Sequence, residues 1–524
     1  MSTKQGMNID QMLNMEGQKS ADRVLIWGLL FAIAVIPLLT RAAIFPFFSP
    51  VITGTSLDTG MKADIFTYYK FIWLMLVVAF AICVFVYKML AKGYQIQPSY
   101  INFPLLIMFV FVLLSGVFAE YKTLAMFGQY NRHEGTLTYL GYFILFFIAA
   151  NILYTEKKMN LLIYALYPLL FINAGLGLAY FYGYDILNNA FFQGILLPAG
   201  LSKESLNGFV SSTINNPNYV SGIAGMLVVL FLTKALLSGQ GKKKALDIIC
   251  AVVAFALLLS SLSTSGFVTF VVLLPLIFVM VLLRRNKKAA LLPALVILIA
   301  FPLVFFAMNS HNSLVWKESL GFFFGTSSGA MEGKNSAGEA IGWKDFVQKH
   351  SPFSVHVASA ATESGNADDE FNLPPQGWAA GTGRVYIWSK TLELIQANPF
   401  LGYGMDTLAY YFPQDDPYKN SGINDPNTIV DKPHNMYIGL AFGSGVIMLL
   451  AFLVLIVRHA WQHVLLFKRR IQTERQAILA SLFAGWCAYL VQAMFNDSVI
   501  GTGFIFWILF GVSVSLLREE RTES

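Results

Sequence analysis

Charged residues are scarce in this sequence: Asp, Glu, Lys and Arg make up 13% of its 524 residues, whereas 56% are hydrophobic. A soluble protein carries about 25% charged residues, so this chain has too few to cover a water-facing surface of its size. The net charge of +6 is too small and too scattered to indicate nucleic acid as a partner. These shortages exclude a soluble globular protein and favour one that sits in the lipid bilayer.

Cysteine is also scarce, and the common catalytic signatures are missing. The three cysteines, Cys83, Cys250 and Cys487, all lie inside apolar runs, which excludes a disulfide framework or a cysteine metal site. The sequence has no phosphate loop, no nucleophile elbow and no His-Glu-x-x-His zinc pair. Transport driven by an internal ATPase is therefore unsupported, and we expect neither a metal nor another cofactor.

What the sequence has instead is a series of apolar stretches of about 17 to 23 residues, the length that crosses a bilayer. The first follows a polar tail, and because no small-residue cleavage site comes after it, we interpret it as a retained helix and not a signal peptide. The predicted fold class is an all-α integral membrane protein with about twelve transmembrane helices. They are expected near 24–45, 65–87, 100–118, 136–153, 161–182, 218–237, 246–262, 267–283, 289–307, 435–457, 477–495 and 501–517.

The loops between these stretches alternate in charge. More than half of the 36 Lys and Arg fall in the two tails and in every second loop. By the positive-inside rule these segments are cytoplasmic, so both termini are predicted to lie inside. An even number of helices agrees with that orientation.

One long segment, 308–434, has no spanning stretch and is predicted to be a large extracytoplasmic loop before the last three helices. It separates an N-terminal transmembrane region of about nine helices (1–307) from a C-terminal region (435–524) with three helices and a short cytoplasmic tail. Connections of this length are uncommon and usually functional.

The second half of this loop carries the clearest pattern. Apolar residues at helical spacing predict an amphipathic helix near 383–397: Val385, Trp388, Leu392 and Ile395. Asn398-Pro399 would end this helix, and Gly402-x-Gly404 would turn the chain. The first half of the loop has no such pattern and is expected to be flexible surface.

The helix centres are nearly free of charged residues, so a proton relay through the membrane is disfavoured. Polar residues gather instead at the outer ends of the helices, where lipid headgroups would lie. They form four clusters: 130–135, 215–219, Gly383-Arg384 with Trp388, and 432–437.

Arginine and histidine in these clusters point to a phosphate-linked substrate. An arginine binds phosphate oxygens in two-point fashion, so Arg384 and Arg132 at headgroup depth suit a pyrophosphate. A histidine with an ordinary pKa near 6.5 is mostly neutral at pH 7, so His434 can take a proton from a hydroxyl. Arg384 and His434 are the predicted catalytic residues. The predicted substrate-binding residues are Arg132, Glu134, Asn216, Asn218, Trp388, Asn435 and Tyr437.

Most of these features also have a purely structural interpretation. An interfacial arginine commonly binds ordinary phospholipid, residues 215–218 fit a turn and helix cap, and Gly439-x-x-x-Gly443 fits helix packing. Two further pairs are predicted to be exposed to solvent: Asn496 and Asp497 in a turn, and His459 and His463 on the cytoplasmic surface.

The loop motifs together resemble a known family. GTGRVYIWSKTLELI (381–395), NPFLGYG (398–404), HNMY (434–437) and GSG (443–445) form a spaced pattern similar to that of the O-antigen ligase and polymerase superfamily. The pattern covers about 65 residues directly, and about twelve helices with one large outer loop also look like the family. Asn216-Pro217-Asn218 and Arg132-x-Glu134-Gly135 resemble further motifs of its members.

The resemblance implies a metal-independent glycosyltransferase of the bacterial plasma membrane. Such enzymes take a glycan from an undecaprenyl-pyrophosphate carrier on the outer face and pass it to a glycan, lipid or protein acceptor. By this resemblance Arg384 would hold the pyrophosphate, and His434 would orient or deprotonate the acceptor. Many members have a Ser-Arg pair at a mid-chain helix end, whereas this chain has Ser263-Thr264-Ser265-Gly266 there, without an arginine. Either Arg132 supplies that charge, or the pyrophosphate is held differently.

Other functions stay open. A lipid-linked glycan flippase or exporter is the main alternative, although a flippase should carry charged residues through its helix interiors. A peptidoglycan polymerase of the shape-elongation-division type would have fewer helices and a different loop pattern. The third alternative is a non-catalytic assembly partner that binds the lipid-linked glycan. The sequence does not separate ligase, polymerase and protein-glycosylating activity, and it does not identify the acceptor.

Overall fold

The computed structural model describes residues 9–198, 212–239, 241–324, 383–416, 419, 428–468 and 470–522. Its regular structure in these ranges is almost entirely helical. The principal helices are α1 (Ile9–Val35), α2 (Tyr68–Leu90), α3 (Asn102–Phe118), α5 (Thr136–Ala150), α6 (Glu156–Tyr164), α7 (Tyr167–Phe181), α9 (Pro217–Leu237), α10 (Gly241–Ser260), α11 (Thr264–Leu283), α12 (Lys288–His311), α16 (Arg384–Ala397), α17 (Met436–Phe467), α18 (Glu474–Gln492) and α19 (Gly503–Thr522).

Shorter elements connect these helices. They are the helices α4 (Lys122–Phe127), α8 (Ala190–Leu196), α13 (Leu314–Lys317) and α14 (Leu320–Phe323), and the 3-10 turns η1 (Ile36–Leu38), η2 (Ile186–Asn188) and η4 (Leu408–Tyr410). The described part also has a two-stranded antiparallel sheet, β1 (Ala43–Phe47) with β2 (Gly60–Asp64), in which Ala43 faces Asp64 and Phe47 faces Gly60. The first half of the predicted loop falls mostly outside the described residues.

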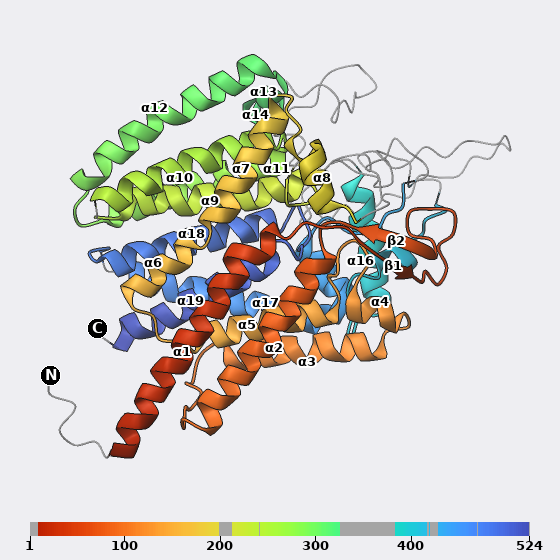
Figure 1. Cartoon of the computed structure of the whole chain (residues 1–524), viewed down its shortest axis with the longest axis horizontal. Helices are drawn as coiled ribbons and strands as arrows, with labels where there is room; N and C mark the ends of the chain where they lie inside the picture. Colours follow the sequence, from red (N-terminus) through yellow and green to blue (C-terminus); the bar gives the residue numbers. More distant parts are fainter. Residues whose placement is uncertain are drawn as a thin grey trace, which may run out of the picture.

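The long helices form a bundle with two distinct ends (Figure 1). Helices α16 and α4 and strands β1 and β2 lie at one end, which we call the loop end. The start of α1 and the end of α19 lie at the opposite end, which we call the terminal end. Helix α9 lies in the interior: every residue from Val220 to Leu237 is buried, and α10, α11 and α18 pack around it.

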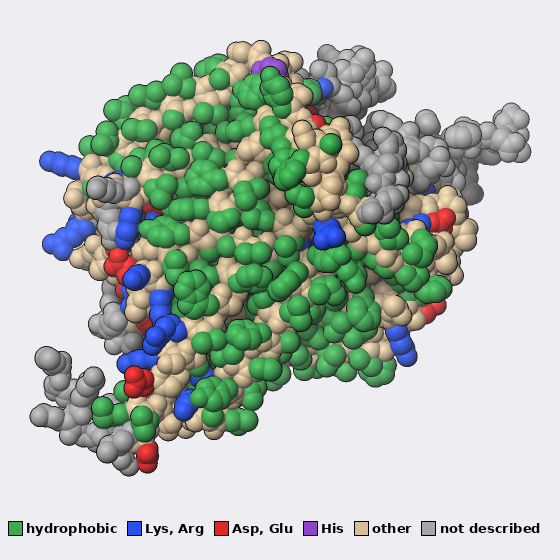
Figure 2. All heavy atoms as spheres, viewed as in Figure 1, with side chains coloured by type: hydrophobic (Ala, Val, Ile, Leu, Met, Phe, Trp, Pro, Cys, Tyr) green, Lys and Arg blue, Asp and Glu red, His purple; other side chains and the backbone are tan. Residues whose placement is uncertain are grey.

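The surface of the bundle is what a lipid environment requires. Figure 2 shows hydrophobic side chains across the middle of the molecule and Lys and Arg side chains gathered at the terminal end. Helix α12 shows the same exposure: Leu291, Leu292 and Leu298 are each about 70% exposed. Exposed apolar helices of this length are stable only where lipid covers them. The chain is an all-α, multi-pass membrane protein.

The number of spanning helices differs from the sequence-based count. Each of the twelve predicted positions holds a helix, but within the described residues only seven are long and apolar enough to cross a membrane. Helices α3 and α5 are apolar but shorter. Helices α10, α18 and α19 each carry charged residues in a terminal turn, such as Lys243 and Lys244 in α10, or Glu474 and Arg475 in α18. The structure therefore supports the fold class and leaves the count of twelve unsupported.

The prediction that His459 and His463 lie on the cytoplasmic surface is wrong. Both side chains are fully buried. Helix α17 continues to Phe467, well beyond the predicted end at 457, and one face of this extension packs against the bundle. There His459 Nδ1 lies 2.7 Å from the Tyr100 hydroxyl, and His463 Nε2 lies 3.0 Å from the Ser513 hydroxyl.

Helix α17 is interrupted at Gly445, whose φ is +84°. In a continuous helix the Val446 N–H would donate to the Phe442 carbonyl. Here Val446 N donates to the Pro399 carbonyl (2.7 Å), and the Phe442 carbonyl accepts from Tyr403 N (2.9 Å). A further bond joins Gly404 N to the Gly443 carbonyl (3.0 Å). The turn 398–404 thus fills the gap in α17, and this pairing fixes α16 at the loop end.

Replacing Gly445 by Ala tests this pairing. A Cβ at Gly445 would collide with the Phe400 carbonyl, and a positive φ is unfavourable for any residue with a side chain. We expect Gly445→Ala to lower the free energy of unfolding by about 2 kcal/mol or more. Thermal unfolding in detergent measures this change.

Gly439→Ala in the same helix is the matched control. A Cβ there would lie 3.5 Å from Pro433 Cγ, an ordinary contact, so this variant should unfold close to the wild-type temperature. If both variants unfold at the wild-type temperature, the pairing between the turn 398–404 and α17 does not contribute the expected free energy of unfolding.

Candidate active site

Helix α16 brings the first predicted catalytic residue to the loop end. Gly383 precedes the helix in the left-handed conformation (φ +79°), and Arg384 is the first helical residue. One turn later, Trp388 Nε1 donates a hydrogen bond to the Pro433 carbonyl (2.7 Å). This bond ties the first turn of α16 to the residue that immediately precedes His434.

The buried face of α16 differs from the predicted apolar face. Tyr386, Ile387, Thr391 and Ile395 are buried, whereas Leu392 is 46% exposed. Tyr386 and Ile387 pack into a hydrophobic cluster that includes residues of η4 and α17. Of the predicted apolar positions, Ile395 belongs to this face. The face otherwise includes a tyrosine and a threonine, and Thr391 satisfies its hydroxyl by donating to the Ile387 carbonyl (2.7 Å).

His434 adopts an uncommon backbone conformation, with φ +51°. Non-glycine residues in this region are held there by their surroundings and are frequent at functional sites. The neighbours of His434 supply the restraint: Trp388 binds the carbonyl of Pro433, and Asn435 caps α17 by accepting from Tyr437 N and Ile438 N. The imidazole itself stays accessible, because its side chain is 41% exposed.

Asp497 faces the histidine from the turn between α18 and α19. Its Oδ2 lies 3.2 Å from His434 Nδ1, and its side chain is 11% exposed. Burial acts to raise the pKa of Asp497, but the contact with His434 and the charges of His434, Lys432 and Arg132 outweigh it, so the pKa is lowered. Asp497 is therefore an ionised partner for His434.

The sequence predicts Asp497, with Asn496, to lie in a solvated turn without a role in the site. That prediction is wrong, since Asn496 is 4% exposed and Asp497 faces a histidine that is 63 positions away in the sequence. No local pattern marks such a pairing. The backbone bonds from Met436 N to the carbonyls of Ala493 (2.9 Å) and Asn496 (3.2 Å) bring the two segments together.

Arg384 is a cation with few partners. In the described part of the chain its guanidinium forms no ion pair, and its buried Nε has no hydrogen-bond partner. Burial lowers the pKa of Arg384, and the negative charge of Asp497 acts in the opposite direction. An arginine with this freedom can bind an anion that enters the site.

Arg132 has a different environment. Its Nη2 lies 2.7 Å from Asp406 Oδ1, its Nε donates to the same oxygen (2.8 Å), and its Nη1 pairs with Asp431. Arg132 and Asp406 are both buried, at 6% and 4% exposure of their side chains. Two carboxylates therefore balance its charge, and they join the turn before α5 to the loop. Its predicted role as a second phosphate contact stays a prediction.

The other predicted substrate-binding residues make contacts within the protein. Asn216 caps α9 by accepting from Asn218 N (2.8 Å), and Asn218 Oδ1 accepts from the Ser263 hydroxyl (2.8 Å). The Tyr437 hydroxyl donates to the Leu490 carbonyl (2.9 Å). These contacts orient helix ends around the site, and binding by the same side chains is untested.

Lys432 was part of a predicted cluster without a role of its own. It is buried, and its Nζ donates to the Tyr219 hydroxyl (3.2 Å) at the start of α9. It thereby links the segment before His434 to the interior helix. Its charge lowers the pKa of Asp497.

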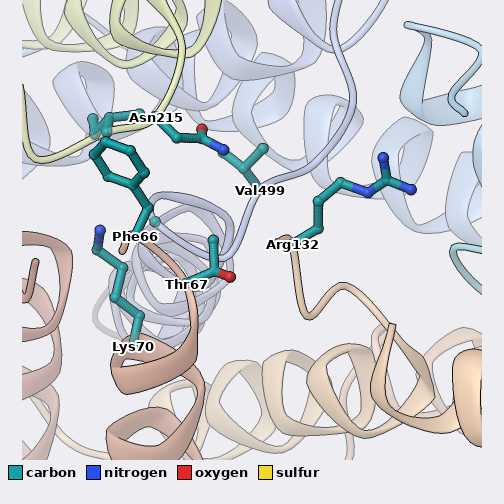
Figure 3. Close-up of a pocket in the computed structure, with 8 residues that line it drawn as sticks. Phe66, Thr67, Lys70, Arg132, Asn215 and Val499 are labelled. Carbon is teal, nitrogen blue, oxygen red and sulfur yellow. The ribbon is translucent and has the colours of Figure 1, made fainter. Parts of the chain in front are cut away.

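Two pockets open near these residues. The first has about 290 Å³ of open space and is lined by Phe66, Thr67, Lys70, Arg132, Ile214, Asn215, Val499 and Gly501 (Figure 3). The second has about 360 Å³ and is lined chiefly by residues of α9, α18 and the turn that contains Asn496 and Asp497. Val499 touches both pockets, so they lie on two sides of the same turn.

The architecture and the site together define a class: a multi-pass helical membrane protein with a histidine–aspartate pair at one end of the bundle, beside an arginine that forms no ion pair with the described residues. Residues 249–453 match the family model described as O-antigen ligase. This match supports an assignment to the O-antigen ligase and polymerase superfamily and a membrane glycan-processing function of that type. No curated protein matches the chain.

The matched range runs from α10 into α17. It contains Arg384, Trp388, His434, Asn435 and Tyr437, and it ends before Asp497. Arg132, Glu134, Asn216 and Asn218 precede it. The backbone pairing between the turn 398–404 and the break in α17 at Gly445 also lies inside the matched range.

Glu134 has a protonation state that can be tested. Its side chain is buried, Oε1 accepts from the Tyr142 hydroxyl (2.7 Å), and Oε2 has no hydrogen-bond partner within the described ranges. Burial raises the pKa of Glu134 to about 8, although Tyr142 and Lys432 act to lower it. The side chain is therefore a neutral acid at pH 7.

Glu134→Gln removes the titrating carboxyl group, so comparison with the wild type isolates the pH dependence of stability that the raised pKa of Glu134 causes. Because the folded pKa of about 8 lies above the unfolded value of about 4.3, the stability from the bound proton is complete below pH 4 and declines until the pH passes about 8. We expect the wild type to lose up to about 1.4 kcal/mol per pH unit between pH 5 and 8, relative to the variant. Thermal unfolding across this range measures the difference, and parallel curves for the two proteins would contradict the raised pKa.

Proposed function

We propose that the chain is a membrane glycosyltransferase that transfers or polymerises a glycan from an undecaprenyl-pyrophosphate carrier onto an acceptor. The observation that carries the proposal is the convergence of His434, Asp497 and Arg384 at the loop end. His434 and Asp497 form a base with an ionised partner, and Arg384 supplies a cation that no carboxylate of the described residues neutralises. Transfer of a glycan from a pyrophosphate carrier needs a base for the acceptor hydroxyl and a cation for the leaving group, and these residues can supply both.

The tautomer of His434 follows from the position of Asp497. With Nδ1–H directed at the carboxylate, the lone pair of Nε2 is free to accept a proton. The acceptor hydroxyl would give its proton to Nε2 while its oxygen bonds to the anomeric carbon of the donor sugar. The bond from that carbon to the pyrophosphate oxygen breaks at the same time, and the leaving group takes the electron pair. Inversion at the anomeric carbon is the expected result, since no carboxylate is assigned as a covalent nucleophile.

Arg384 would act on the leaving group. Negative charge builds up on the pyrophosphate as the bond breaks, and a fixed guanidinium stabilises that charge without a metal. Partial burial strengthens this effect, because the local dielectric constant is lower than in water. The apolar surfaces of the bundle would hold the polyprenyl chain of the carrier.

The proposed orientation places the loop end outside the plasma membrane and both termini in the cytoplasm. The Lys and Arg side chains at the terminal end support it, because positive charge is retained on the cytoplasmic side (Figure 2). In that orientation the site would meet carrier-linked glycans on the outer leaflet.

Complementation of a deletion strain tests the reaction. We expect Arg384→Ala and His434→Ala to make carrier-linked glycan accumulate outside while the surface glycan is lost, since each removes about a hundredfold to a thousandfold in rate. Gel electrophoresis and mass spectrometry of the lipid-linked and surface glycans measure this outcome, with membrane expression of each variant verified.

The same experiment separates the alternatives. Accumulation on the cytoplasmic leaflet would indicate a flippase, and normal surface glycan in both variants would contradict the site assignment. The length of the carrier-linked glycan would separate a polymerase from a ligase.

Asp497→Asn tests the role of the aspartate as a positioning residue. An asparagine can present its amide N–H to Nδ1, which favours the tautomer that carries its proton on Nε2 and so cannot act as a base there. We expect the initial rate of glycan transfer in isolated membranes to fall about a hundredfold or more, with the donor concentration for half-maximal rate little changed. Asp415→Asn, at an exposed carboxylate of the same loop, is the control. A weaker donor interaction with an unchanged maximal rate would contradict a positioning role.

A further inference from the structure

The pocket shown in Figure 3 contains a buried lysine that the proposed mechanism does not use. Lys70 lies in the first turn of α2 and is 1% exposed. Its Nζ donates to the Thr213 carbonyl (2.7 Å) and lies 5.8 Å from the centre of the Phe66 ring. An ammonium group has three N–H donors, and the described residues supply one acceptor.

No carboxylate within the described ranges forms an ion pair with Lys70. Asp64 is on the same side, but its two oxygens accept from Phe66 N (3.1 Å), Thr67 N (2.8 Å), the Thr67 hydroxyl (2.8 Å) and Tyr68 N. These bonds also satisfy the free amides at the start of α2. The lysine is consequently the group in this wall of the pocket that can bind an anion.

The opposite wall carries Arg132, whose charge is not available. Figure 3 shows its guanidinium directed away from Lys70, and Asp406 and Asp431 pair with it there. The pocket is otherwise lined by apolar side chains, such as Phe66, Ile214 and Val499, and by the exposed amide of Asn215. This lining combines a buried lysine with apolar side chains, the two features that a phosphate with an apolar chain attached would contact.

We propose that Lys70 and this pocket bind a phosphate group of a prenyl-pyrophosphate carrier. The inference rests on the proposed function, and it gives this chain a second cation for the pyrophosphate in place of the arginine absent from 263–266. The two N–H groups of Lys70 for which the described residues offer no acceptor donate to phosphate oxygens, and the apolar lining contacts the first part of the prenyl chain. Val499 and the adjoining turn connect this pocket to Asp497 and so to His434.

Binding to the purified full-length chain in lipid nanodiscs tests the proposal. The probes are farnesyl pyrophosphate and inorganic pyrophosphate, titrated by calorimetry into discs of phosphatidylcholine. We expect Lys70→Met to raise the Kd for farnesyl pyrophosphate about tenfold to a hundredfold, because a charge-assisted hydrogen bond is lost. Lys70→Arg, which keeps the charge, should stay within a few-fold of the wild type, and inorganic pyrophosphate should show the same dependence on Lys70 at weaker affinity.

Lys62→Met is the matched control. Lys62 lies on β2, also at the loop end, but it pairs with Asp58 and does not line the pocket, so its loss should leave the Kd unchanged. Thermal unfolding of each variant without ligand shows whether Lys70 merely supports the Thr213 carbonyl. A lower unfolding temperature with an unchanged Kd would overturn the proposal.

A second arm distinguishes the source of the phosphate. Discs that contain phosphatidylglycerol should not compete with farnesyl pyrophosphate, and competition that depends on Lys70 would assign the pocket to ordinary lipid headgroups and overturn the proposal. Absence of farnesyl pyrophosphate binding to the wild type would also overturn it. The glycosyltransferase function is judged separately by the accumulation of carrier-linked glycan in the Arg384 and His434 variants.

Discussion

The backbone pairing between the turn 398–404 and the break in α17 is the constraint on which the site depends. Three hydrogen bonds bridge the gap around Gly445, and the glycines at 402 and 445 leave no room for side chains there. This pairing sets where α16 begins and ends relative to α17. Arg384 at the start of α16 and His434 just before α17 are then brought together by the bond from Trp388 to the Pro433 carbonyl. A glycine-rich break in α17 therefore helps to place the two residues that we propose to be catalytic.

The basic side chains at the loop end differ in whether carboxylates pair with them. Arg132 is balanced by Asp406 and Asp431, and this buried network joins the turn before α5 to the loop. Breaking such a network is costly, since a single charge would be left buried. Arg384 and Lys70 form no such pairs within the described part of the chain. The two arginines therefore have different surroundings: carboxylates pair with Arg132, and none of the described carboxylates forms an ion pair with Arg384.

The sequence predicts much of the fold because lipid imposes a simple rule. Apolar stretches of spanning length marked the position of every long helix, and the loop motifs marked Arg384 and His434. Charges at helix ends and the short length of α3 and α5 are the reason that twelve stretches do not make twelve supported spans. The features that the sequence does not predict depend on contacts between residues far apart in the chain. Asp497 contacts His434 only in the folded protein, and Lys70 lines a pocket built from four segments. His459 and His463 beside basic residues had the pattern of a surface, and only the length of α17 shows that they are buried.

Reconstitution of the purified chain with a lipid-pyrophosphate-linked oligosaccharide and a glycan acceptor tests the central claim most directly. The assay follows release of the free carrier pyrophosphate and glycosylation of the acceptor by mass spectrometry, with the donor confined to one leaflet. We predict that the wild type releases the carrier and glycosylates the acceptor when the donor faces the loop end. Arg384→Ala and His434→Ala should neither release the carrier nor glycosylate the acceptor. A wild-type protein that moves intact donor between leaflets without releasing the carrier would contradict it.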